Sequence, residues 1–281
     1  MAKHRSAALV QEGITQLTGR SDSPRLDAEV LLLAACGINR TALARDPDQP
    51  IDAQSADAFF SFLKRRCRAE PIAYILGHKE FWSLDIELND ATLVPRPETE
   101  ILVEMTLDAI PRDTAIELAD LGTGSGAIAL ALAIERPLAR ITATDISRAA
   151  LTKARENAKR LALDIHFVEG DWYAPLNGHQ FDAIVSNPPY VRREDPALET
   201  GPAHFEPALA LFAGDDGLDC IRTLCAGLKD HLRPGGLVVL EHGHNQQDAV
   251  HALLFATGLE SIVQVTDHAG LARVTSARMP R

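Results

Sequence analysis

Residues 181–190, with the sequence FDAIVSNPPY, combine an apolar segment with side chains that can grip a planar NH2 group. The nitrogen of such a group is a poor nucleophile because its lone pair is delocalised. The side-chain oxygen of Asn187 and the carbonyl of Pro188 can each accept one of its N–H bonds, which aligns the nitrogen and favours the positive charge that develops on it. Pro188 and Pro189 carry no N–H and stiffen the loop, while Tyr190 can pack over a flat group. These residues suit methylation of a planar nitrogen; a rigid Asn-Pro turn without chemistry is the alternative.

A glycine-rich loop at residues 120–126, with the sequence DLGTGSG, follows an apolar segment and precedes a helical pattern. Glycines at such a turn let the backbone approach a ligand closely. Asp145 ends the next apolar segment, where a carboxylate can accept hydrogen bonds from both hydroxyls of a ribose. The loop therefore predicts a cofactor that contains a nucleoside, and a glycine turn without a ligand is the alternative.

Two cofactors fit this loop. Gly122, Gly124 and Ala127 satisfy the G-x-G-x-x-G/A pattern of dinucleotide binding, so a nicotinamide-dependent dehydrogenase is one hypothesis. The other is S-adenosylmethionine, which has no pyrophosphate. Asp120 can meet the cationic amino-acid end of that molecule, and Trp172 can stack on its adenine. Since a dehydrogenase leaves the Asn-Pro-Pro-Tyr motif unexplained, the sequence favours S-adenosylmethionine.

Short apolar segments alternate with helical patterns from residue 115 onward. Strands are expected at 116–121, 141–144, 165–168, 181–185, 237–240, 262–265 and 272–277, and helices at 99–109, 127–133, 149–161, 218–232 and 248–256. This alternation predicts an α/β fold with a mostly parallel sheet covered on both faces. Ligands of such sheets bind at the carboxyl ends of the strands, so Gly124, Asp145, Trp172 and Asn187 are expected to face one crevice.

The residues before Gly77 have a different, helical character. Pro24 after a serine cap, with Gly37 as a stop signal, is typical of a helix. The elements expected in this part and just beyond it are helices over 25–36 and 55–68 and a hairpin whose strands, 84–88 and 92–94, flank a turn at 89–90.

Composition excludes several classes of protein. The chain has 281 residues with 28 Lys and Arg against 39 Asp and Glu, a net charge of -11, so a general polyanion binder is not expected. No stretch approaches the ~20 apolar residues of a membrane span, and the first residues lack the apolar core of a signal peptide. The 4 cysteines form no CxxC pair, which favours a reduced, cytoplasmic setting. His242 and His244 have no further Cys or His at ligand spacing, so no metal is expected.

The motifs extend over most of the chain and resemble those of the peptide chain release factor glutamine methyltransferases, the PrmC or HemK family. The matching positions are Arg65, Arg66 and residues 70–77, 80–82, 95–100, 120–127, 145–147, 187–190, 205–207, 214–219 and 241–243 with Gln246. The Pro-Arg-Pro-Glu-Thr-Glu segment at 95–100 is more specific than Asn-Pro-Pro-Tyr, which is shared with enzymes that methylate adenine or other proteins. The first 60 residues match only loosely.

The resemblance implies methyl transfer from S-adenosyl-L-methionine, leaving S-adenosyl-L-homocysteine, to the glutamine amide in the Gly-Gly-Gln motif of class I release factors. It implies a helical substrate-docking domain (1–77), a β-hairpin connector (78–97) and a class I, Rossmann-like methyltransferase domain with a mostly parallel seven-stranded sheet (98–281). Cofactor contacts carry over to Gly122, Thr123, Gly124, Ser125, Gly126, Asp145, Trp172 and Asn187, to which the residue analysis adds Asp120. Substrate contacts carry over to Asn187, Pro188, Pro189 and Tyr190, of which Asn187, Pro188 and Tyr190 are the expected catalytic residues.

Other functions stay open. They are glutamine methylation of a ribosomal protein, methylation of the adenine amino group in nucleic acid, and a non-catalytic binding module that keeps the fold. We expect a monomer without membrane contact and without a nucleic-acid substrate. The basic run Lys64–Arg68 is either a docking surface for the release factor or a solvated helix face. Arg96 and Glu98 either shape the entrance of the crevice or form a local ion pair.

Overall fold

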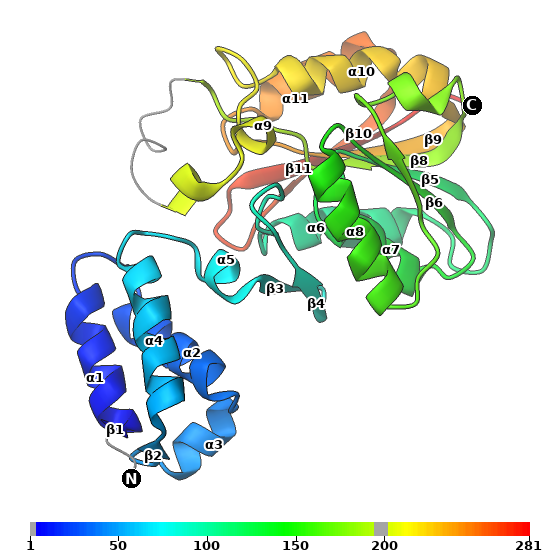
Figure 1. The fold of residues 1–281 in the computed structure, drawn as a ribbon. Coiled ribbons are helices and arrows are strands. Elements are labelled where there is room, and N and C mark those ends of the chain that lie inside the picture. Colours follow the sequence, from blue (N-terminus) through cyan, green and yellow to red (C-terminus); the bar gives the residue numbers. More distant parts are fainter. Residues whose placement is uncertain (1–3, 194–201) are drawn as a thin grey trace. The chain divides into compact units, whose positions relative to one another are not determined.

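The computed structural model describes residues 4–193 and 202–281, which form two compact units that meet in sequence at Gly77. The first unit also includes the short 3₁₀ turn η3 (Pro202–Phe205). The second unit contains the remaining described residues from His78 onward. Figure 1 shows the elements of each unit.

The first unit is a small helical domain around its own apolar core. Its elements are β1 (His4–Arg5), α1 (Ser6–Leu17), α2 (Pro24–Cys36), α3 (Arg40–Arg45), β2 (Pro50–Ile51), α4 (Ala53–Arg66) and α5 (Ile72–Leu76). Leu17, Leu31 and Phe59 are fully buried between α1, α2 and α4. Helix α1 approaches α2 so closely that a Cβ atom at Gly13 would lie only 2.7 Å from the Cβ of Ala28. Helix packing, rather than the two-residue strands, therefore holds this unit together.

The predicted helix over 25–36 is confirmed, and Gly37 ends it in the left-handed conformation with φ of 63°. The Ser23 hydroxyl makes no capping bond to the backbone; it donates to the Asp27 carboxylate, 3.0 Å away. The second predicted helix begins earlier than expected because Asp52 caps it by accepting from the Ser55 N–H at 2.9 Å.

Two of the four basic residues in the run Lys64–Arg68, Arg65 and Arg66, make side-chain contacts inside the first unit. Arg66 donates to Asp27 at 2.7 Å, and both side chains are mostly buried. Arg65 forms an ion pair with Glu70 and also donates to the carbonyl of Ile75 at 3.2 Å. These two arginines therefore support the fold of the unit.

The connector hairpin lies one element earlier in the chain than the sequence predicted. Strand β3 (His78–Phe81) pairs with β4 (Leu84–Glu87), and the turn is Trp82–Ser83 rather than 89–90. Residues 92–94, predicted as a strand, are not one, so that prediction is wrong. Asn89 does form a turn, but its side chain accepts from the N–H of Ala91 and leads the chain out of the hairpin.

The observed turn needs tertiary support, because Trp82 and Ser83 both adopt positive φ, 53° and 58°. This conformation suits a two-residue hairpin but is costly for residues other than glycine and asparagine. The Trp82 N–H donates to Glu100 at 2.8 Å, and its indole N–H donates to Glu135 at 3.1 Å. Contacts with distant helices therefore place the turn where local sequence preference does not.

The second unit contains a seven-stranded sheet in the order β10-β11-β9-β8-β5-β6-β7. The strands are β5 (Glu117–Leu121), β6 (Arg140–Asp145), β7 (His166–Glu169), β8 (Phe181–Ser186), β9 (Leu232–Glu241), β10 (Glu260–Thr266) and β11 (Ala272–Arg278). Strand β11 is antiparallel to both β9 and β10, and the other pairs are parallel. The predicted mostly parallel α/β sheet is confirmed.

Helices cover both faces of this sheet (Figure 1). They are α6 (Thr99–Ala109), α7 (Ala127–Glu135), α8 (Arg148–Arg160), α10 (Asp219–His231) and α11 (Gln247–Ala256), with the short η1 (Ala174–Leu176) and α9 (Ala208–Leu211) in loops. Phe181 and Ile184 of β8 and Leu224 of α10 belong to the same apolar core, to which residues of α11 also contribute. In the described part of the chain, no helix has both the length and the apolarity needed to cross a membrane.

Candidate active site

A pocket of about 370 Å³ opens at the carboxyl ends of β5, β6 and β8. The predicted residues that line it are Gly122, Thr123, Gly124, Ser125, Asp145, Trp172, Asn187 and Pro189. Ala91, Leu93, Pro95, Thr99, Pro207, Leu209 and Phe212 are among the other lining residues. The two sequence motifs, which lie more than 60 positions apart, therefore meet at one pocket, as the sequence predicted.

The glycine loop needs glycine for two separate reasons. Gly122, Gly124 and Gly126 all have positive φ, 76°, 56° and 85°. A side chain at Gly122 would lie 3.1 Å from the ring of Trp172, and one at Gly126 would lie 3.2 Å from the Cβ of Ala154 on α8. The loop therefore packs between the ring of Trp172 and helix α8, with little room for side chains at Gly122 and Gly126.

Asp145 stands at the end of β6 and holds the glycine loop in place. Its Oδ2 accepts from the Gly124 N–H and its Oδ1 from the Ser147 N–H, both at 2.8 Å. Burial raises the pKa of this carboxyl, and the two backbone bonds oppose that shift. Each carboxylate oxygen can accept more than one bond, so Asp145 also has capacity for the hydroxyls of a ribose.

Asp120 is fully buried and is not among the residues that line the pocket. Its Oδ2 accepts from the Thr123 hydroxyl at 2.6 Å, and burial raises its pKa to about 7. Its Oδ1 has no hydrogen-bond partner among the residues whose structure is described. Asp120 therefore supports the glycine loop through Thr123. Its contact with a cationic group of the cofactor stays a prediction.

Asn187 follows β8 directly and presents an unused acceptor. Its Nδ2 donates to the Thr99 hydroxyl at 3.1 Å, while its buried Oδ1 has no partner within the described part of the chain. A buried carbonyl oxygen without a partner costs about 1–3 kcal/mol, so the position is stabilised when a ligand donates to it. An NH2 group that enters the pocket is the donor that fits.

Tyr190 and Pro188 do not line the pocket, in contrast to Asn187 and Pro189. The Tyr190 hydroxyl donates to Oε1 of Glu241 at 3.1 Å, and burial raises its pKa well above the usual range. The tyrosine carbonyl accepts from the Gln246 side chain at 3.0 Å. In this structure Tyr190 thus anchors the motif from behind, whereas the sequence predicted packing over the substrate.

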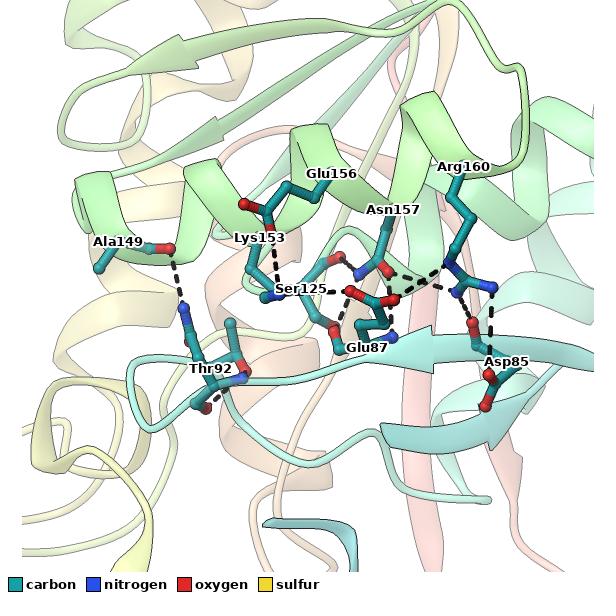
Figure 2. Close-up of polar contacts among 10 residues, drawn as sticks. Asp85, Glu87, Thr92, Ser125, Ala149, Lys153, Glu156, Asn157 and Arg160 are labelled. Carbon is teal, nitrogen blue, oxygen red and sulfur yellow. Dashed lines mark hydrogen bonds and ion pairs between the residues drawn. The ribbon is translucent and has the colours of Figure 1, made fainter. Parts of the chain in front are cut away.

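Asn157 on α8, shown in Figure 2, makes supporting contacts that the sequence analysis missed. Its Oδ1 accepts from the Glu87 N–H at 3.0 Å, and its Nδ2 donates to the carbonyls of Glu87 at 2.9 Å and Ser125 at 3.0 Å. One buried side chain therefore ties hairpin strand β4 to the glycine loop. Neither the residue type of Asn157 nor its position on a predicted helix indicates this role in the sequence.

Arg96 forms an ion pair with Glu206, whose side chain is fully buried, so the expected local pair with Glu98 is not the contact observed. Glu206 also accepts from the Val94 N–H at 3.3 Å. This pair fixes the start of the segment that brings Pro207 and Phe212 to the pocket. The interpretation that Arg96 shapes the crevice is thus consistent with the geometry.

No cluster of potential metal ligands occurs among residues 4–193 and 202–281. His242 is fully buried, and its ring nitrogens contact the Gly243 carbonyl at 3.0 Å and the Thr275 hydroxyl at 2.8 Å. Both ring nitrogens are therefore engaged in structural hydrogen bonds.

Comparison with known proteins defines the class. Residues 98–215 match the model of the methyltransferase small domain, and residues 8–77 match that of the PrmC N-terminal domain. A methyltransferase from Pyrococcus furiosus shares the fold at a TM-score of 0.55 and 21% identity, over 78% of this chain and 99% of that chain. A Thermus thermophilus 16S rRNA N2 G1207 methyltransferase, solved with AdoMet and guanosine, does so at 0.53 and 19%, over 72% and 49%. The fold is that of the class I S-adenosylmethionine-dependent methyltransferases.

Curated relatives narrow this class to one family. Release factor glutamine methyltransferases from Xylella fastidiosa and Burkholderia pseudomallei are 48% and 44% identical to this chain. The matches cover 91% and 94% of this chain and 94% and 95% of theirs. The Salmonella typhimurium enzyme is 42% identical over 96% of this chain and 97% of its own. The chain belongs to the release factor glutamine methyltransferase family.

Proposed function

We propose that this protein transfers a methyl group from S-adenosyl-L-methionine to the side-chain amide nitrogen of the glutamine in the Gly-Gly-Gln motif of class I release factors. The observation that carries the proposal is the buried Oδ1 of Asn187, which has no hydrogen-bond partner among the described residues and belongs to a residue that lines the pocket together with the glycine loop. Family membership supplies the substrate, because the relatives are named for release factor glutamine methylation.

The pocket residues fit this cofactor. The Asp145 carboxylate would hold the ribose hydroxyls, Trp172 would offer an aromatic face for adenine, and Gly122 to Ser125 would surround the amino-acid portion with backbone. When bound, the cofactor supplies an activated methyl carbon on a sulfonium. These assignments account for the lining of the pocket between β5 and β6.

The acceptor side of the pocket orients the glutamine amide. Asn187 Oδ1 and the carbonyl of Pro188, a residue that does not itself line the pocket in this structure, would each accept one N–H. The two bonds would fix the plane of the amide and stabilise the positive charge that develops on nitrogen. Transfer of the methyl group would leave the cofactor sulfur as a thioether, and the methylated nitrogen would give up one proton to water. A separate general base is not needed, because the nitrogen becomes acidic once it is methylated.

Mass spectrometry of a release factor after incubation with the protein and cofactor tests the proposal. The expected result is a mass gain of one methylene group on the glutamine of the Gly-Gly-Gln motif, absent when that residue is replaced by alanine. Parallel incubations with ribosomes and RNA separate the two rival substrates. Methylation of either in place of the release factor would contradict the proposal.

We infer from this function that the protein acts in the cytoplasm, with the release factor as its protein partner. We infer that it acts as a monomer and takes no nucleic-acid substrate. The net charge of -11 supports the second inference, because it opposes association with phosphate backbones. Sedimentation of the pure protein tests the first.

A further inference from the structure

Gln246 is a buried side chain that the proposed reaction does not use. It directly precedes α11, has 7% of its surface exposed and is not among the residues that line the pocket. Glutamine lies mostly at protein surfaces, and burial of its amide is costly unless both ends form hydrogen bonds. The partners of the amide therefore show what this side chain holds.

Backbone groups hold the Gln246 amide at both ends. Its Oε1 accepts from the Gly243 N–H at 2.9 Å. Its Nε2 donates to the carbonyls of Tyr190 at 3.0 Å and Gly217 at 3.2 Å, and the carbonyl of Asp216 lies further away at 3.4 Å. A backbone N–H can only donate and a carbonyl can only accept, so these partners fix which end of the amide faces Tyr190.

The Asn-Pro-Pro-Tyr motif at 187–190 needs an anchor of this kind. Its two prolines have no N–H group, so neither can donate a hydrogen bond to the surrounding backbone. Carbonyls and side chains must hold the motif instead. The asparagine side chain donates to the Thr99 hydroxyl at 3.1 Å, and the Tyr190 carbonyl accepts from Gln246 at 3.0 Å. The Pro188 carbonyl lies between these two anchors in the sequence.

Gly217 shows how closely the loop before α10 packs against the second anchor. It has φ of 77°, and a Cβ atom at this position would lie 2.7 Å from Gln246 Nε2 and closer still to the Tyr190 carbonyl oxygen. Directly after Tyr190, the Val191 N–H donates to the carbonyl of Leu211 at 2.9 Å. Gln246 therefore joins the motif to the loop before α10, at the point where the chain goes on to pair with the end of α9.

We propose that Gln246 is a positioning residue for methyl transfer, whose NH2 group holds the Tyr190 carbonyl and so sets the direction of the Pro188 carbonyl two residues earlier. The intervening proline has a fixed φ, and the Tyr190 hydroxyl is bound to Glu241, so few torsions stay free between the two anchors. Loss of the NH2 group releases one anchor and lets the peptide groups of the motif rotate. This inference rests on the proposed function, because it concerns how the second acceptor for the glutamine amide is aligned.

Gln246→Met tests the proposal, because it keeps the length of the side chain and removes the amide. We expect kcat to fall by about tenfold to a hundredfold, since small misplacements of groups that orient a substrate have effects of this size. Calorimetry with S-adenosyl-L-homocysteine should give a cofactor Kd within about threefold of wild type and an unchanged number of binding sites. A general loss of folding would instead lower the number of binding sites.

Gln264→Met is the matched control, with the same substitution beside the same helix. The Gln264 Nε2 donates to the carbonyl of Gln247 at 2.7 Å, one residue after Gln246. This variant loses a bond of the same kind at a place that does not hold the motif, so it should keep the kcat of wild type. Equal kcat for Gln246→Met and Gln264→Met, with both proteins folded, would overturn the proposal.

A pair of glycine variants disturbs the same carbonyl from the other side and decides the matter if Gln246→Met does not fold. Gly217→Ala and Gly270→Ala place alanine at nearly the same φ, 77° and 78°, so both carry similar backbone strain. A Cβ atom at Gly217 would press on the Tyr190 carbonyl, whereas one at Gly270 would meet no atom of the described residues within 4 Å. We expect kcat to fall at least about fivefold in Gly217→Ala only. Equal kcat in the two variants would contradict the proposal.

Hydrogen–deuterium exchange without substrate separates this inference from the proposed function. The N–H groups of Val191 and Ala213 join the chain after the motif to the end of α9. In Gln246→Met they should exchange at least about threefold faster than in wild type, while the glycine loop keeps its wild-type rates, because only the motif has lost an anchor. Unchanged exchange at Val191 and Ala213 overturns the inference even if release factor methylation is confirmed. A failed methylation assay with the wild-type protein contradicts the proposed function and does not affect this measurement.

Discussion

The two sides of the pocket differ in how completely their acceptors are satisfied. On the β6 side, both carboxylate oxygens of Asp145 already accept backbone N–H groups. On the β8 side, the Oδ1 of Asn187 has no partner in the described part of the chain. The first side is assembled before any ligand arrives, whereas the second side is completed only by a donor from outside.

This difference separates binding from chemistry. A satisfied carboxylate keeps the glycine loop in one conformation, so its loss should weaken cofactor binding. An unsatisfied amide oxygen gains its partner only with the substrate, and the bond strengthens as charge develops on nitrogen, so its loss should lower turnover. Variants of the two residues should therefore affect different constants.

The largest effect is expected for Asn187→Ala. Removing one group that stabilises developing charge typically lowers kcat by about 10²–10³-fold. The cofactor Kd should stay within about threefold of wild type, because the Asp145 side is untouched. Steady-state kinetics with a release factor and calorimetry with S-adenosyl-L-homocysteine measure the two constants. Turnover equal to wild type would remove Asn187 from the mechanism.

Asp145→Ala should raise the cofactor Kd by about 10–100-fold, the loss expected for charge-assisted hydrogen bonds, and leave kcat at saturating cofactor within about fivefold. Asp145→Asn is the matched variant, because it keeps the shape and one acceptor and should lie between alanine and wild type. A cofactor Kd that does not change in either variant would contradict the assigned role.

Asn157→Leu should lower the free energy of unfolding by about 2 kcal/mol, because it leaves the N–H and carbonyl of Glu87 and the carbonyl of Ser125 without partners. Its effect on cofactor Kd should be several-fold, smaller than that of Asp145→Ala. Lys153→Met removes the neighbouring ion pair with Glu156, shown in Figure 2, and a second ion pair with Glu87, and should cost less than about 1 kcal/mol because both pairs are partly exposed. Equal unfolding free energies for the two variants would show that the Asn157 hydrogen bonds between β4 and the glycine loop do not stabilise the fold.

The smallest effect concerns pH. Burial raises the pKa of Asp120 from 3.8 to about 7, so the folded state binds this proton more tightly than the unfolded state. Its contribution to stability is fully present below pH 3.8 and is lost as pH rises toward 7. Asp120→Asn should therefore flatten part of the decline in melting temperature over this range. A decline as steep as that of wild type would show that Asp120 titrates normally.

Local sequence was sufficient for the parts of the site that follow strands directly. The glycine loop and Asn187 each come after a short apolar segment, and the parallel sheet brings the ends of such segments together. The class of cofactor and the type of acceptor could therefore be predicted from residue types and spacing.

The supporting residues could not be predicted in this way, because their contacts join distant positions. Thr99 and Asn187 are separated by 88 positions, and Glu87 and Asn157 by 70. The Trp82–Ser83 turn shows the same limit, since contacts with Glu100 and Glu135 override local preference. Local propensity depends on neighbouring residues, so it cannot indicate contact partners that lie far apart in the sequence.

A crystal structure of the protein with S-adenosyl-L-homocysteine and a Gly-Gly-Gln peptide tests the central claim most directly. The account predicts that the glutamine amide nitrogen lies within hydrogen-bonding distance of both Asn187 Oδ1 and the Pro188 carbonyl. A complex in which Asn187 turns its oxygen away from the glutamine, or in which the amide binds elsewhere, would contradict it.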